Sequence, residues 1–324
     1  MKIVVTQRIH PEIAELLSAH GTLIANDSLD PWPRAQLLDH ARDAHALMVF
    51  MPDSLDDAFL AACPDLRIVA AALKGPDNFD IQACTQRGIW FTLAGDLLSE
   101  PTAELALALM LGLARNIAPG DRHIRAGQFQ GWRPTLYGTG LAGSTVGLIG
   151  YGAVARALAG MLQGFTCEIQ FHDPAHPGSI PLDQLLASSD FILPLVPLTP
   201  ATLHLINTQT LRTTKRGAYL INVSRGSVVD EAAIAAALES GQLSGYAADT
   251  FEMEDWARPR RPREIHPRLL ALTDRTLFTP HLGSAVASVR KEIERAAASN
   301  IIAALEGRRP PGAVNSPATP RNAR

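Results

Sequence analysis

The chain has 324 residues, of which 47% are hydrophobic and 19% are charged, and its formal net charge is −3. This length allows two hydrophobic cores, and the charged fraction is too high for a protein embedded in a membrane. The charge provides no basic surface for nucleic acid or for an anionic membrane, so the expected partner is a small molecule.

The three cysteines, Cys63, Cys84 and Cys167, are odd in number and widely spaced. They fit neither a disulfide framework nor a metal-binding motif, so we expect buried thiols and no metal site. The N-terminus enters a strand at once, without the pattern of a signal peptide, and the longest apolar stretch, 105–114, is about half of a bilayer span. We therefore expect a soluble, cytoplasmic protein.

Short apolar strands alternate with amphipathic helices over the first third of the chain, which predicts a parallel sheet with helices on both faces. The expected elements are strands over 2–6, 46–51, 67–72 and 88–93 and helices over 11–19 and 55–63. A long apolar helix, Thr102–Asn116, then interrupts the pattern. It follows Pro101 and has Thr102 as its expected N-cap.

The segment Thr145–Ala155, TVGLIGYGAVA, predicts a buried strand that runs into a glycine turn and then a helix. Gly150 forms the tight turn, Gly152 lets a phosphate approach the backbone, and Ala155 stands where a third glycine is usual. The N–H groups of the following helix, Val154–Leu162, then point at the bound anion. The alternative is an ordinary strand–turn–helix.

A second strand, 167–173, ends in Asp173, which follows Gly150 by 23 positions. A carboxylate at about this offset accepts hydrogen bonds from the ribose hydroxyls of a dinucleotide and repels a 2′-phosphate. No Lys or Arg adjoins Asp173, so we expect NAD rather than NADP as the cofactor.

The later part of the chain predicts a second doubly wound sheet. Its expected strands cover 191–197, 217–224, 245–251 and 276–280. A last helix, Ala285–Leu305, follows this sheet, which indicates that the chain crosses back and that the first domain is built from both ends of the sequence. The tail from 307 to 324 is rich in Pro and Arg and is expected to be a loose extension.

We therefore predict an α/β protein of two doubly wound parallel-sheet (Rossmann-like) domains with an active-site cleft between them. The substrate-binding domain is expected to be discontinuous, with residues 1–99 and 287–324. Residues 100–286 are expected to form the NAD-binding Rossmann domain.

Polar residues that close strands are candidate site residues, because ligands of doubly wound sheets bind beyond the carboxyl ends of the strands. Arg225 follows an apolar strand, and its planar fork of donors can hold a small anion, with a surface salt bridge as the alternative. The next strand ends at Asp249 and is followed by two acids, Glu252 and Glu254, either of which can instead cap a turn. His281 ends a strand before a glycine turn, where a structural histidine is the alternative. Lys74 lies at a glycine turn in the first domain.

The glycine turn, Asp173, Arg225, Glu254 and His281, in this order, resemble the D-isomer-specific 2-hydroxyacid dehydrogenase family over almost the whole chain. The resemblance implies that Arg225 polarises and anchors the substrate, that His281 exchanges a proton, and that Glu254 hydrogen-bonds His281. It also implies a homodimer formed through the nucleotide-binding domains, with helix 102–116 as a contributor.

Seven further motifs resemble the phosphite (phosphonate) dehydrogenase branch of that family. They are FMPD at 50–53, ALKGPDNFD at 72–80, DLLSEPTAEL at 96–105, FQGWRPTLYGTGL at 129–141, RGSVVDE at 225–231, YAADTFEMEDWA at 246–257 and FTPHLGSAV at 278–286. This resemblance implies NAD-dependent oxidation of phosphite to phosphate, with hydride transfer to NAD. Pro76 departs from the pattern, because an aromatic residue is expected there.

Phosphite is a small dianion, so its site needs several cations. Lys74, Arg225 and Arg290 are expected to supply them, and the alternative for Arg290 is a solvated helix face with Glu292 and Glu294 as partners. Trp132 and Tyr137 are expected either to close over the site and exclude water or to pack at a domain or subunit interface. The expected substrate-binding residues are Met51, Lys74, Gly75, Trp132, Tyr137, Arg225, His281 and Arg290.

The resemblance also implies a set of cofactor contacts from turns and strand ends. The expected NAD-binding residues are Lys74, Thr102, Gly150, Gly152, Ala153, Val154, Asp173, Val196, Pro197, Val223, Ser224, Arg225, Asp249, His281 and Gly283.

Two other functions use the same residues. The first is reduction of a 2-oxo acid such as glyoxylate or hydroxypyruvate, that is, a D-2-hydroxyacid dehydrogenase acting through Arg225, Glu254 and His281 on a carbonyl group. The second is a non-catalytic NADH-sensing binding protein. The intact set of arginine, glutamate and histidine argues against the second, because a sensor has no need of a proton-transfer pair.

Overall fold

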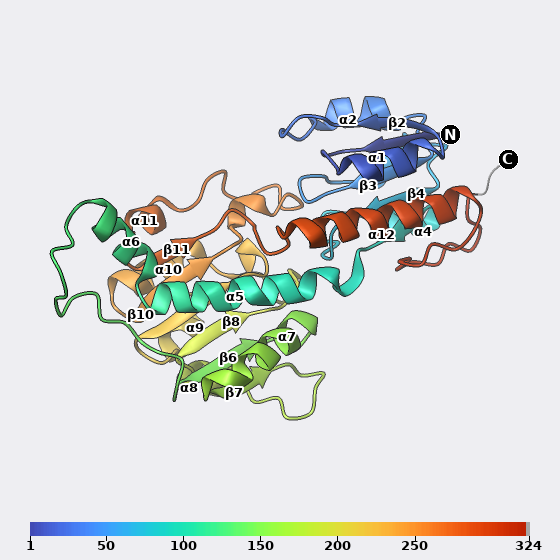
Figure 1. Ribbon diagram of the computed structural model, residues 1–324. Helices are drawn as coiled ribbons and strands as arrows, with labels where there is room; N and C mark the ends of the chain where they lie inside the picture. The colour runs from blue at the N-terminus through green and yellow to red at the C-terminus, as the bar shows by residue number, and fades with distance from the viewer. Residues whose placement is uncertain (322–324) are drawn as a thin grey trace. The chain divides into compact units, whose positions relative to one another are not determined.

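The computed structural model describes residues 1–321, which form two compact units (Figure 1). Unit 1 comprises residues 1–98, 256–259 and the chain from 285 onward, and unit 2 comprises residues 99–255 and 260–284. The expected boundaries after residues 99 and 286 lie within two residues of these limits. The segment 256–259, which we expected in the second domain, groups with unit 1.

Unit 1 contains a sheet of five parallel strands in the order β2-β1-β3-β4-β5. The strands are β1 Lys2–Val5, β2 Thr22–Ala25, β3 Ala46–Val49, β4 Ile68–Ala71 and β5 Trp90–Thr92. Strands β3 and β4 are buried along their whole length, as inner strands of a parallel sheet are. Strand β2 has no prediction from the sequence, because its apolar run is only three residues long and this edge strand is not fully buried.

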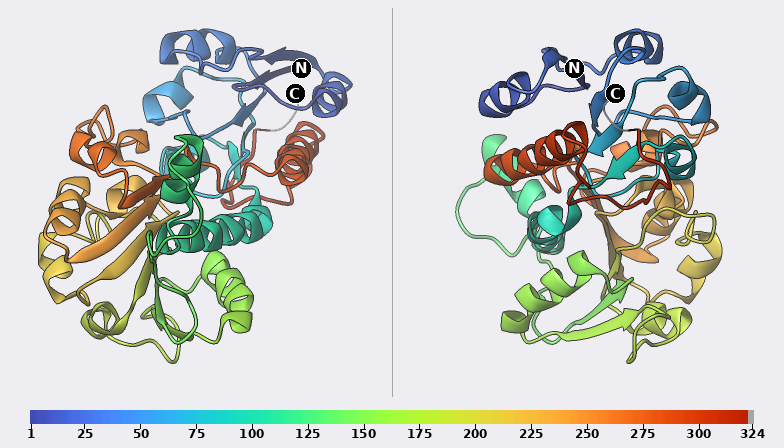
Figure 2. Two further views of the ribbon diagram at one scale, coloured as in Figure 1. Left: turned by 60° about the vertical axis from the view of Figure 1, so that its left-hand side comes forward. Right: turned by 90° about the vertical axis from the view of Figure 1, so that its right-hand side faces the viewer.

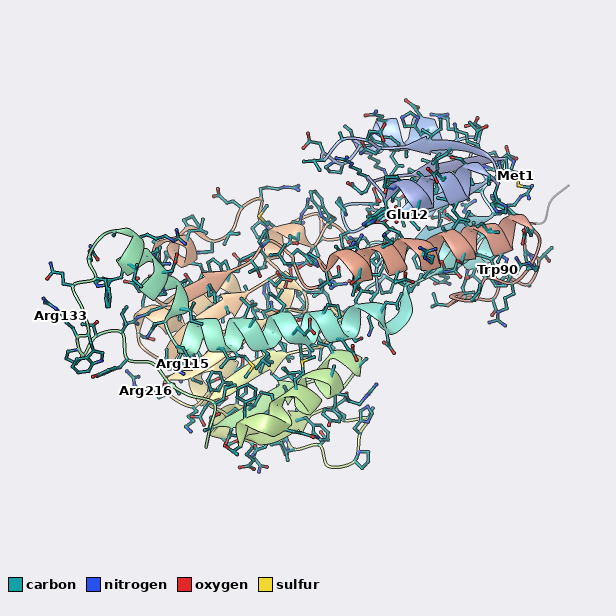
Figure 3. The ribbon with its side chains drawn as sticks, viewed as in Figure 1. Met1, Glu12, Trp90, Arg115, Arg133 and Arg216 are labelled. Carbon is teal, nitrogen blue, oxygen red and sulfur yellow. The ribbon has the colours of Figure 1, made fainter. Side chains whose placement is uncertain are left out.

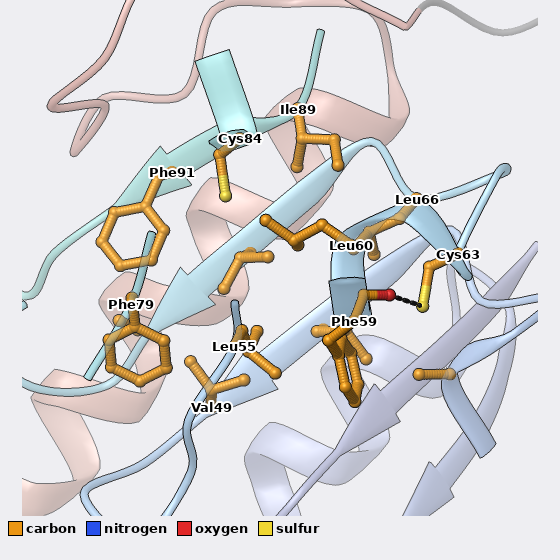
Figure 4. Packing of buried hydrophobic residues seen from close by; sticks show 14 of the residues in the cluster. Val49, Leu55, Phe59, Leu60, Cys63, Leu66, Phe79, Cys84, Ile89 and Phe91 are labelled. Atoms are coloured by element: carbon orange, nitrogen blue, oxygen red, sulfur yellow. Dashed lines mark hydrogen bonds between the residues drawn. The ribbon is translucent and has the colours of Figure 1, made fainter. Parts of the chain in front are cut away.

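Helices cover both faces of this sheet. They are α1 Pro11–Ser18, α2 Arg34–Ala41, α3 Asp57–Ala61, α4 Ile81–Gln86 and α12 Ala287–Leu305, with a 3₁₀ turn η1 at Gly95–Leu98. Successive strand residues point to opposite faces: Met48 packs with α1 and α12, whereas Leu47 and Val49 pack with α2, α3 and α4. Figure 4 shows the second of these cores, in which Phe79 and Phe91 lie side by side at one end of the aliphatic side chains and Phe59 packs among them.

The cysteines are free thiols. Cys63 and Cys84 lie in the core of Figure 4, and the Cys63 thiol donates to the Phe59 carbonyl oxygen at 3.4 Å. Burial raises the pKa of Cys63 to about 11 and that of Cys84 to about 12. Cys167, in unit 2, is half-buried rather than buried as expected.

The C-terminal segment packs on unit 1, so the expectation of a loose extension is wrong for residues 310–321. Thr92 and Ala313 form an antiparallel bridge, and the Val314 N–H donates to the Phe91 carbonyl oxygen at 3.0 Å. Asn315 is buried, and its side-chain oxygen accepts from the Phe91 N–H at 2.8 Å. A sequence without periodicity can therefore still be fixed by individual polar contacts to a strand edge.

Unit 2 contains six parallel strands in the order β11-β10-β9-β8-β6-β7 (Figure 2). The strands are β6 Thr145–Ile149, β7 Glu168–His172, β8 Phe191–Pro194, β9 Ala218–Asn222, β10 Leu243–Ala248 and β11 Thr276–Phe278. The helices are α5 Ser99–Ala114, α6 Ile117–Arg125, α7 Ala153–Leu162, α8 Leu182–Ser188, α9 Thr208–Thr213, α10 Glu231–Glu239 and α11 Pro267–Ala271, with 3₁₀ turns η2 Gln163–Phe165, η3 Gly226–Val228 and η4 Glu252–Glu254. The strand order reverses at β6, whose neighbours are β7 and β8, and the crevice at such a reversal is where ligands bind.

Helix α5 begins at Ser99, so Thr102 lies inside the helix and is not its N-cap, contrary to our expectation. Pro101 does not interrupt the helix, because an N–H in the first turn has no partner in the helix anyway. The stretch Gly95–Ala114 is long and apolar enough to span a membrane. Its buried side chains, among them Met110, instead pack in the core with α7 and the sheet, as those of a globular core helix do.

Candidate active site

The glycine turn follows β6 at the reversal of strand order. Gly150 has φ +91°, and a Cβ there would lie 2.8 Å from the Leu195 carbonyl oxygen and 2.9 Å from Val196 Cγ1. A Cβ at Gly152 would meet nothing within 4 Å. Helix α7 starts at Ala153 and has no side-chain cap on its first N–H groups. The turn therefore offers an open concave backbone with donors for an anion such as a pyrophosphate.

Asp173 comes directly after β7 and is bound to this turn. Its carboxylate accepts from the Tyr151 N–H at 2.9 Å and from the Ala175 N–H at 3.1 Å, and these backbone hydrogen bonds lower its pKa. The Tyr151 ring stacks on Phe171 with centroids 4.0 Å apart. The Asp173 carboxylate, which we expected to bind ribose, is thus hydrogen-bonded to the glycine turn, where we expected the phosphate site.

The side chains that follow β9, β10 and β11 include a close histidine–glutamate pair. His281 Nδ1 lies 2.6 Å from Glu254 Oε2, and both side chains are about one quarter exposed. The other oxygen of Glu254 accepts from the Phe251 N–H at 2.8 Å. Because Glu254 occupies Nδ1, the Nε2 atom is the ring nitrogen of His281 that remains to exchange a proton with a ligand.

His281 has φ +56°, a left-handed conformation that residues other than glycine seldom adopt. The buried carboxylate of Asp249 holds this turn. One of its oxygens accepts from the Thr279 hydroxyl and from the Leu282 N–H, each at 2.6 Å, and the other accepts from the Gly283 N–H at 2.8 Å. Burial raises the pKa of Asp249. The sequence predicted Asp249 as a cofactor residue, and the structure gives its carboxylate a positioning role as well.

Arg225 follows β9 and is fixed by its neighbours. Its carbonyl oxygen accepts from Asn222 Nδ2 at 2.9 Å, and its own Nη1 donates to the Ser224 carbonyl oxygen at 2.9 Å. A Cβ at Gly226 would lie 1.8 Å from the Phe251 carbonyl carbon, so the turn after Arg225 packs directly on the turn that carries Glu254. Only glycine fits at this position.

Other predicted cofactor residues of unit 2 lie around these turns. Val196 and Pro197 follow β8, and Val196 lies against Gly150. Val223 and Ser224 follow β9, and the Ser224 hydroxyl donates to Asn222 Oδ1 at 2.9 Å. Thr102 Oγ1 would lie 3.1 Å from a Cβ at Gly283, so the first turn of α5 reaches the histidine turn.

Four predicted substrate residues, Met51, Lys74, Gly75 and Arg290, belong to unit 1. Lys74 Nζ forms an ion pair with Asp96 at 2.6 Å, a partner that the sequence did not indicate. The Arg290 guanidinium lies over the Phe50 ring, 5.7 Å from its centroid, and burial lowers its pKa. Arg290 is therefore partly buried against Phe50, and Glu294, one of the partners named in the alternative, still acts on its charge.

The loop after β3 holds Phe50 and Met51. The buried Asp53 carboxylate accepts from the Thr6 hydroxyl and from the Phe50 N–H, and the Met51 carbonyl oxygen accepts from Asn78 Nδ2 at 2.9 Å. Burial raises the pKa of Asp53 to about 6. The motif FMPD thus forms a loop that is braced from within and that places Phe50 under Arg290.

The structure does not bring Trp132 and Tyr137 to His281 within one chain. Both side chains are strongly exposed, at 82% and 75%, in the segment that follows α6. This segment is attached to the C-terminal end of α5, where the Thr139 N–H donates to the Ala114 carbonyl oxygen, about 18 Å along the helix from Thr102. Figure 3 shows Arg133 on this segment and Arg115 at the end of α5.

No group of three or more His, Cys, Asp or Glu side chains that could hold a metal ion occurs in residues 1–321. Sequence reasoning missed the roles of Asp96 and Phe50. Their partners, Lys74 and Arg290, are distant in the sequence, so no local signal indicates these contacts.

A comparison with protein families matches residues 107–283 to the NAD-binding domain of the D-isomer specific 2-hydroxyacid dehydrogenases. A glyoxylate reductase of Pyrococcus horikoshii is 36% identical over 297 residues, which cover 87% of this chain and 86% of that protein. The TT0316 protein of Thermus thermophilus is 32% identical, with a TM-score of 0.89 and coverage of 97% of this chain and 100% of that one.

A third relative is an NADPH-dependent glyoxylate/hydroxypyruvate reductase of Sinorhizobium meliloti, solved with NADP and malonate. It is 28% identical, with a TM-score of 0.78, and the match covers 93% of this chain and 92% of that chain. NAD is the cofactor of the matched domain. The open backbone at Gly152, the uncapped start of α7 and the carboxylate of Asp173 fit this cofactor.

Proposed function

The chain belongs to the D-isomer specific 2-hydroxyacid dehydrogenase family, and on this premise we propose that it transfers a hydride between NAD and a small anionic substrate through Arg225, Glu254 and His281. The observation that carries this proposal is the 2.6 Å pair of Glu254 and His281. It lies beside the turn of Arg225 at the carboxyl edge of the sheet of unit 2. A binding protein that only senses NADH has no use for such a pair.

Bound NAD supplies the hydride acceptor, and the reduced cofactor supplies the donor. Arg225 binds an anionic oxygen of the substrate with its planar fork and offsets the charge that develops there. His281 moves a proton at Nε2, while Glu254 fixes the ring through Nδ1 and stabilises the protonated ring. These roles are the same whether the reacting atom of the substrate is carbon or phosphorus.

We propose phosphite as the substrate, oxidised to phosphate, with His281 as the general base that takes a proton from the water that adds to phosphorus. The motifs around Lys74 and Glu254 support this choice, because they resemble the phosphite-oxidising branch. The cations Lys74 and Arg290 of unit 1 are proposed to complete the binding of the dianion. In the structure Lys74 is paired with Asp96, so the substrate has to compete with that carboxylate.

Glyoxylate reduction is the second candidate, and the relatives support it more directly than they support phosphite oxidation. The relatives include glyoxylate reductases that are 36% identical to this chain. In this reaction Arg225 binds the carboxylate of the 2-oxo acid and protonated His281 donates to the carbonyl oxygen. Hydroxypyruvate would be accepted in the same way.

Three assays of the purified protein separate these functions. We expect NADH to form from NAD and phosphite. Consumption of NADH with glyoxylate or hydroxypyruvate at a higher kcat/KM would replace phosphite with the second candidate. Tight NADH binding without turnover of any of these substrates would leave the sensor as the function.

Lys74→Ala measures how much the substrate depends on a second cation. At an effective dielectric constant near 20, one charge pair at 4 Å is worth about 4 kcal/mol, and the existing pair with Asp96 offsets part of this. We expect kcat/KM for phosphite to fall about 10- to 100-fold and that for glyoxylate to fall less. Lys215→Ala, which removes a comparable ion pair with Asp190 at 2.7 Å, is the matched control and should leave both unchanged. An equal loss for both substrates would contradict the phosphite assignment.

We also propose a homodimer, and the segment from α6 to residue 137 supports it. Exposed apolar side chains gather there: Ile117, Ile124, Phe129, Trp132, Leu136 and Tyr137. Such a surface is unusual on a monomer and indicates an interface. It favours the subunit-interface alternative for Trp132 and Tyr137. Sedimentation should show a dimer that dissociates on Trp132→Ser with Tyr137→Ser, and a native monomer would contradict the proposal. A cytoplasmic location remains a prediction from the sequence.

A further inference from the structure

His204 lies in the chain between β8 and α9 and has an uncommon backbone conformation. Its φ is +50°, in the left-handed region that is uncommon for residues other than glycine, although asparagine, aspartate and histidine adopt it more often than the rest. Such a conformation persists only where the surrounding contacts hold it. The contacts of His204 therefore show which parts of the chain hold it in this conformation.

Three hydrogen bonds fix His204, and two of them lead to the active-site turns. Its N–H donates to the Ser227 carbonyl oxygen at 2.7 Å, and its ring Nε2 lies 2.8 Å from Glu252 Oε2. Its carbonyl oxygen accepts from Asn207 Nδ2 at 2.8 Å, which ties it to the start of α9. Ser227 comes two residues after Arg225, and Glu252 comes two residues before Glu254.

The two turns that His204 contacts are packed on each other. The Ser227 N–H donates to Asp255 Oδ2 at 2.7 Å, and Gly226 lies against the Phe251 and Glu252 backbone. Glu252 and Glu231 also exchange backbone-to-carboxylate hydrogen bonds at 2.9 and 3.2 Å, which join η4 to the start of α10. A displacement of η4 therefore changes the position of Glu254 relative to Arg225.

We propose that His204 is a positioning residue that fixes Arg225 against the Glu254–His281 pair by bonding to both turns at once. It touches neither the substrate nor the cofactor in this scheme. The inference rests on the proposed function, because Arg225, Glu254 and His281 carry the reaction there. It goes beyond that function by naming a residue that no motif of the sequence indicates.

The test compares His204→Asn with His204→Gln. Asparagine tolerates a positive φ but its side chain is too short to reach Glu252, whereas the amide of glutamine can replace the ring nitrogen. We expect His204→Asn to lower kcat at least tenfold and to raise the KM for the substrate. The KM for NAD should stay within twofold, because the glycine turn and Asp173 are not part of this network. His204→Gln should recover kcat to within threefold of the native value.

Two further variants separate positioning from loss of stability. Glu252→Ala removes the same contact from the other side, together with the hydrogen bond from the Glu231 N–H, and should lower kcat at least as much as His204→Asn. Leu186→Ala removes a buried side chain of α8 and serves as the control for destabilisation, with kcat unchanged at a temperature where it remains folded. The proposal is overturned if His204→Asn stays within threefold of native, if glutamine does not rescue, or if the control loses as much activity.

Oxalate binding to the NADH-loaded protein, measured by calorimetry, reads the position of Arg225 without turnover. We expect His204→Asn to weaken oxalate binding about fivefold, and unchanged binding would contradict the inference. Absence of native turnover with phosphite, glyoxylate and hydroxypyruvate would remove the proposed function instead, so the two failures are distinguishable.

Discussion

Two turns at the same edge of the sheet of unit 2 each place a residue at a positive φ, and they stabilise it in different ways. The turn after β6 places Gly150 at φ +91°, and the turn after β11 places His281 at φ +56°. Glycine tolerates this conformation without help. Histidine does not, and the buried Asp249 accepts three hydrogen bonds from the turn around it.

The difference shows how far each turn depends on the rest of the chain. The glycine turn depends on the absence of a Cβ at Gly150 and Gly152, so its properties are local. The histidine turn depends on Asp249, which follows β10, and on Glu254 of η4, whose carboxylates lie 2.6 to 2.8 Å from their partners in the turn. Substitutions can break either turn, and the resulting changes should separate catalysis, cofactor affinity and stability.

The largest effect is expected for the catalytic side chain of the histidine turn. His281→Ala should lower kcat by about 10²–10⁴-fold, because it removes general acid–base assistance. NAD binding, measured by fluorescence titration, should stay within a few-fold, since the glycine turn is intact. Turnover close to native would remove His281 from the proposed mechanism.

Unit 1 contains a second buried carboxylate that holds a loop, Asp53, which accepts hydrogen bonds from Thr6 and Phe50. The pH dependence of the free energy of unfolding measures how much the burial of its charge destabilises the protein. Asp53 has a pKa of about 6 in the folded protein, above its ordinary value, so proton binding favours the folded state. This stabilisation is present below about pH 4 and is lost as the pH rises through 6. Asp53→Asn cannot ionise and should exceed the native protein in stability at pH 7.5 by at most about 3 kcal/mol.

Denaturant unfolding at pH 4 and pH 7.5 measures this gain. The two proteins should differ little at pH 4, where Asp53 of the folded protein is almost fully protonated. An advantage of the variant that is equal at both pH values would show that the carboxylate charge is not its cause.

Glu254→Gln tests the partner of His281. The substitution keeps a hydrogen-bond acceptor for Nδ1 but removes the charge, and hydrogen bonds to charged groups contribute about 1.5–3 kcal/mol. We expect kcat to fall about 10- to 100-fold, less than for His281→Ala, with unchanged NAD affinity. Asp274→Asn, which removes an exposed carboxylate of the same unit, is the control. A loss larger than that of His281→Ala would mean that Glu254 acts on more than the histidine.

The two glycines of the first turn should respond differently to alanine. Gly152→Ala should raise the Kd for NAD about tenfold, a cost of about 1.4 kcal/mol, with an unchanged melting temperature, because its Cβ enters open space. Gly150→Ala should destabilise the protein by about 1–2 kcal/mol, since its Cβ meets the Leu195 carbonyl oxygen at a positive φ. Equal effects on stability would contradict the view that Gly152 serves the ligand alone.

The smallest effect is expected at Asp173. Asp173→Ala should reduce the preference for NAD over NADP about fivefold by removing the repulsion of a 2′-phosphate. Pro174→Arg in addition should favour NADP further through its guanidinium. Steady-state kcat/KM for both cofactors measures the change. A native enzyme that uses both cofactors equally well would contradict this role of Asp173.

The contrast between the two turns also explains how far the sequence could predict the molecule. The glycine turn and Asp173 are a short motif with a fixed offset, so their positions follow from the sequence. His281 and Glu254 could be predicted as site residues from the resemblance, but their 2.6 Å contact could not be derived from spacing. It depends on β10 and β11 being neighbours, which is a property of the whole sheet.

Other features gave no sequence signal for the same reason. The ion pair of Lys74 with Asp96 joins two loops that the alternation of strands and helices leaves unassigned. The buried Asn315 lies in a segment without periodicity, where composition indicated a loose tail. In both cases the contact is made by single polar side chains, and patterns of apolar residues carry no information about them.

Unit 1 is assembled from both ends of the chain, and this has a consequence for synthesis on the ribosome. Residues Met48 and Ile68 of its sheet are covered by α12, which follows residue 98 by almost two hundred positions. At a synthesis rate of about 5–20 residues per second, α12 is made about 10 to 40 s after residue 98. During this time the apolar face of the unit 1 sheet lacks α12, while the strands of unit 2 are being made. We therefore expect the first hundred residues of the nascent chain to keep an apolar face exposed for most of its synthesis.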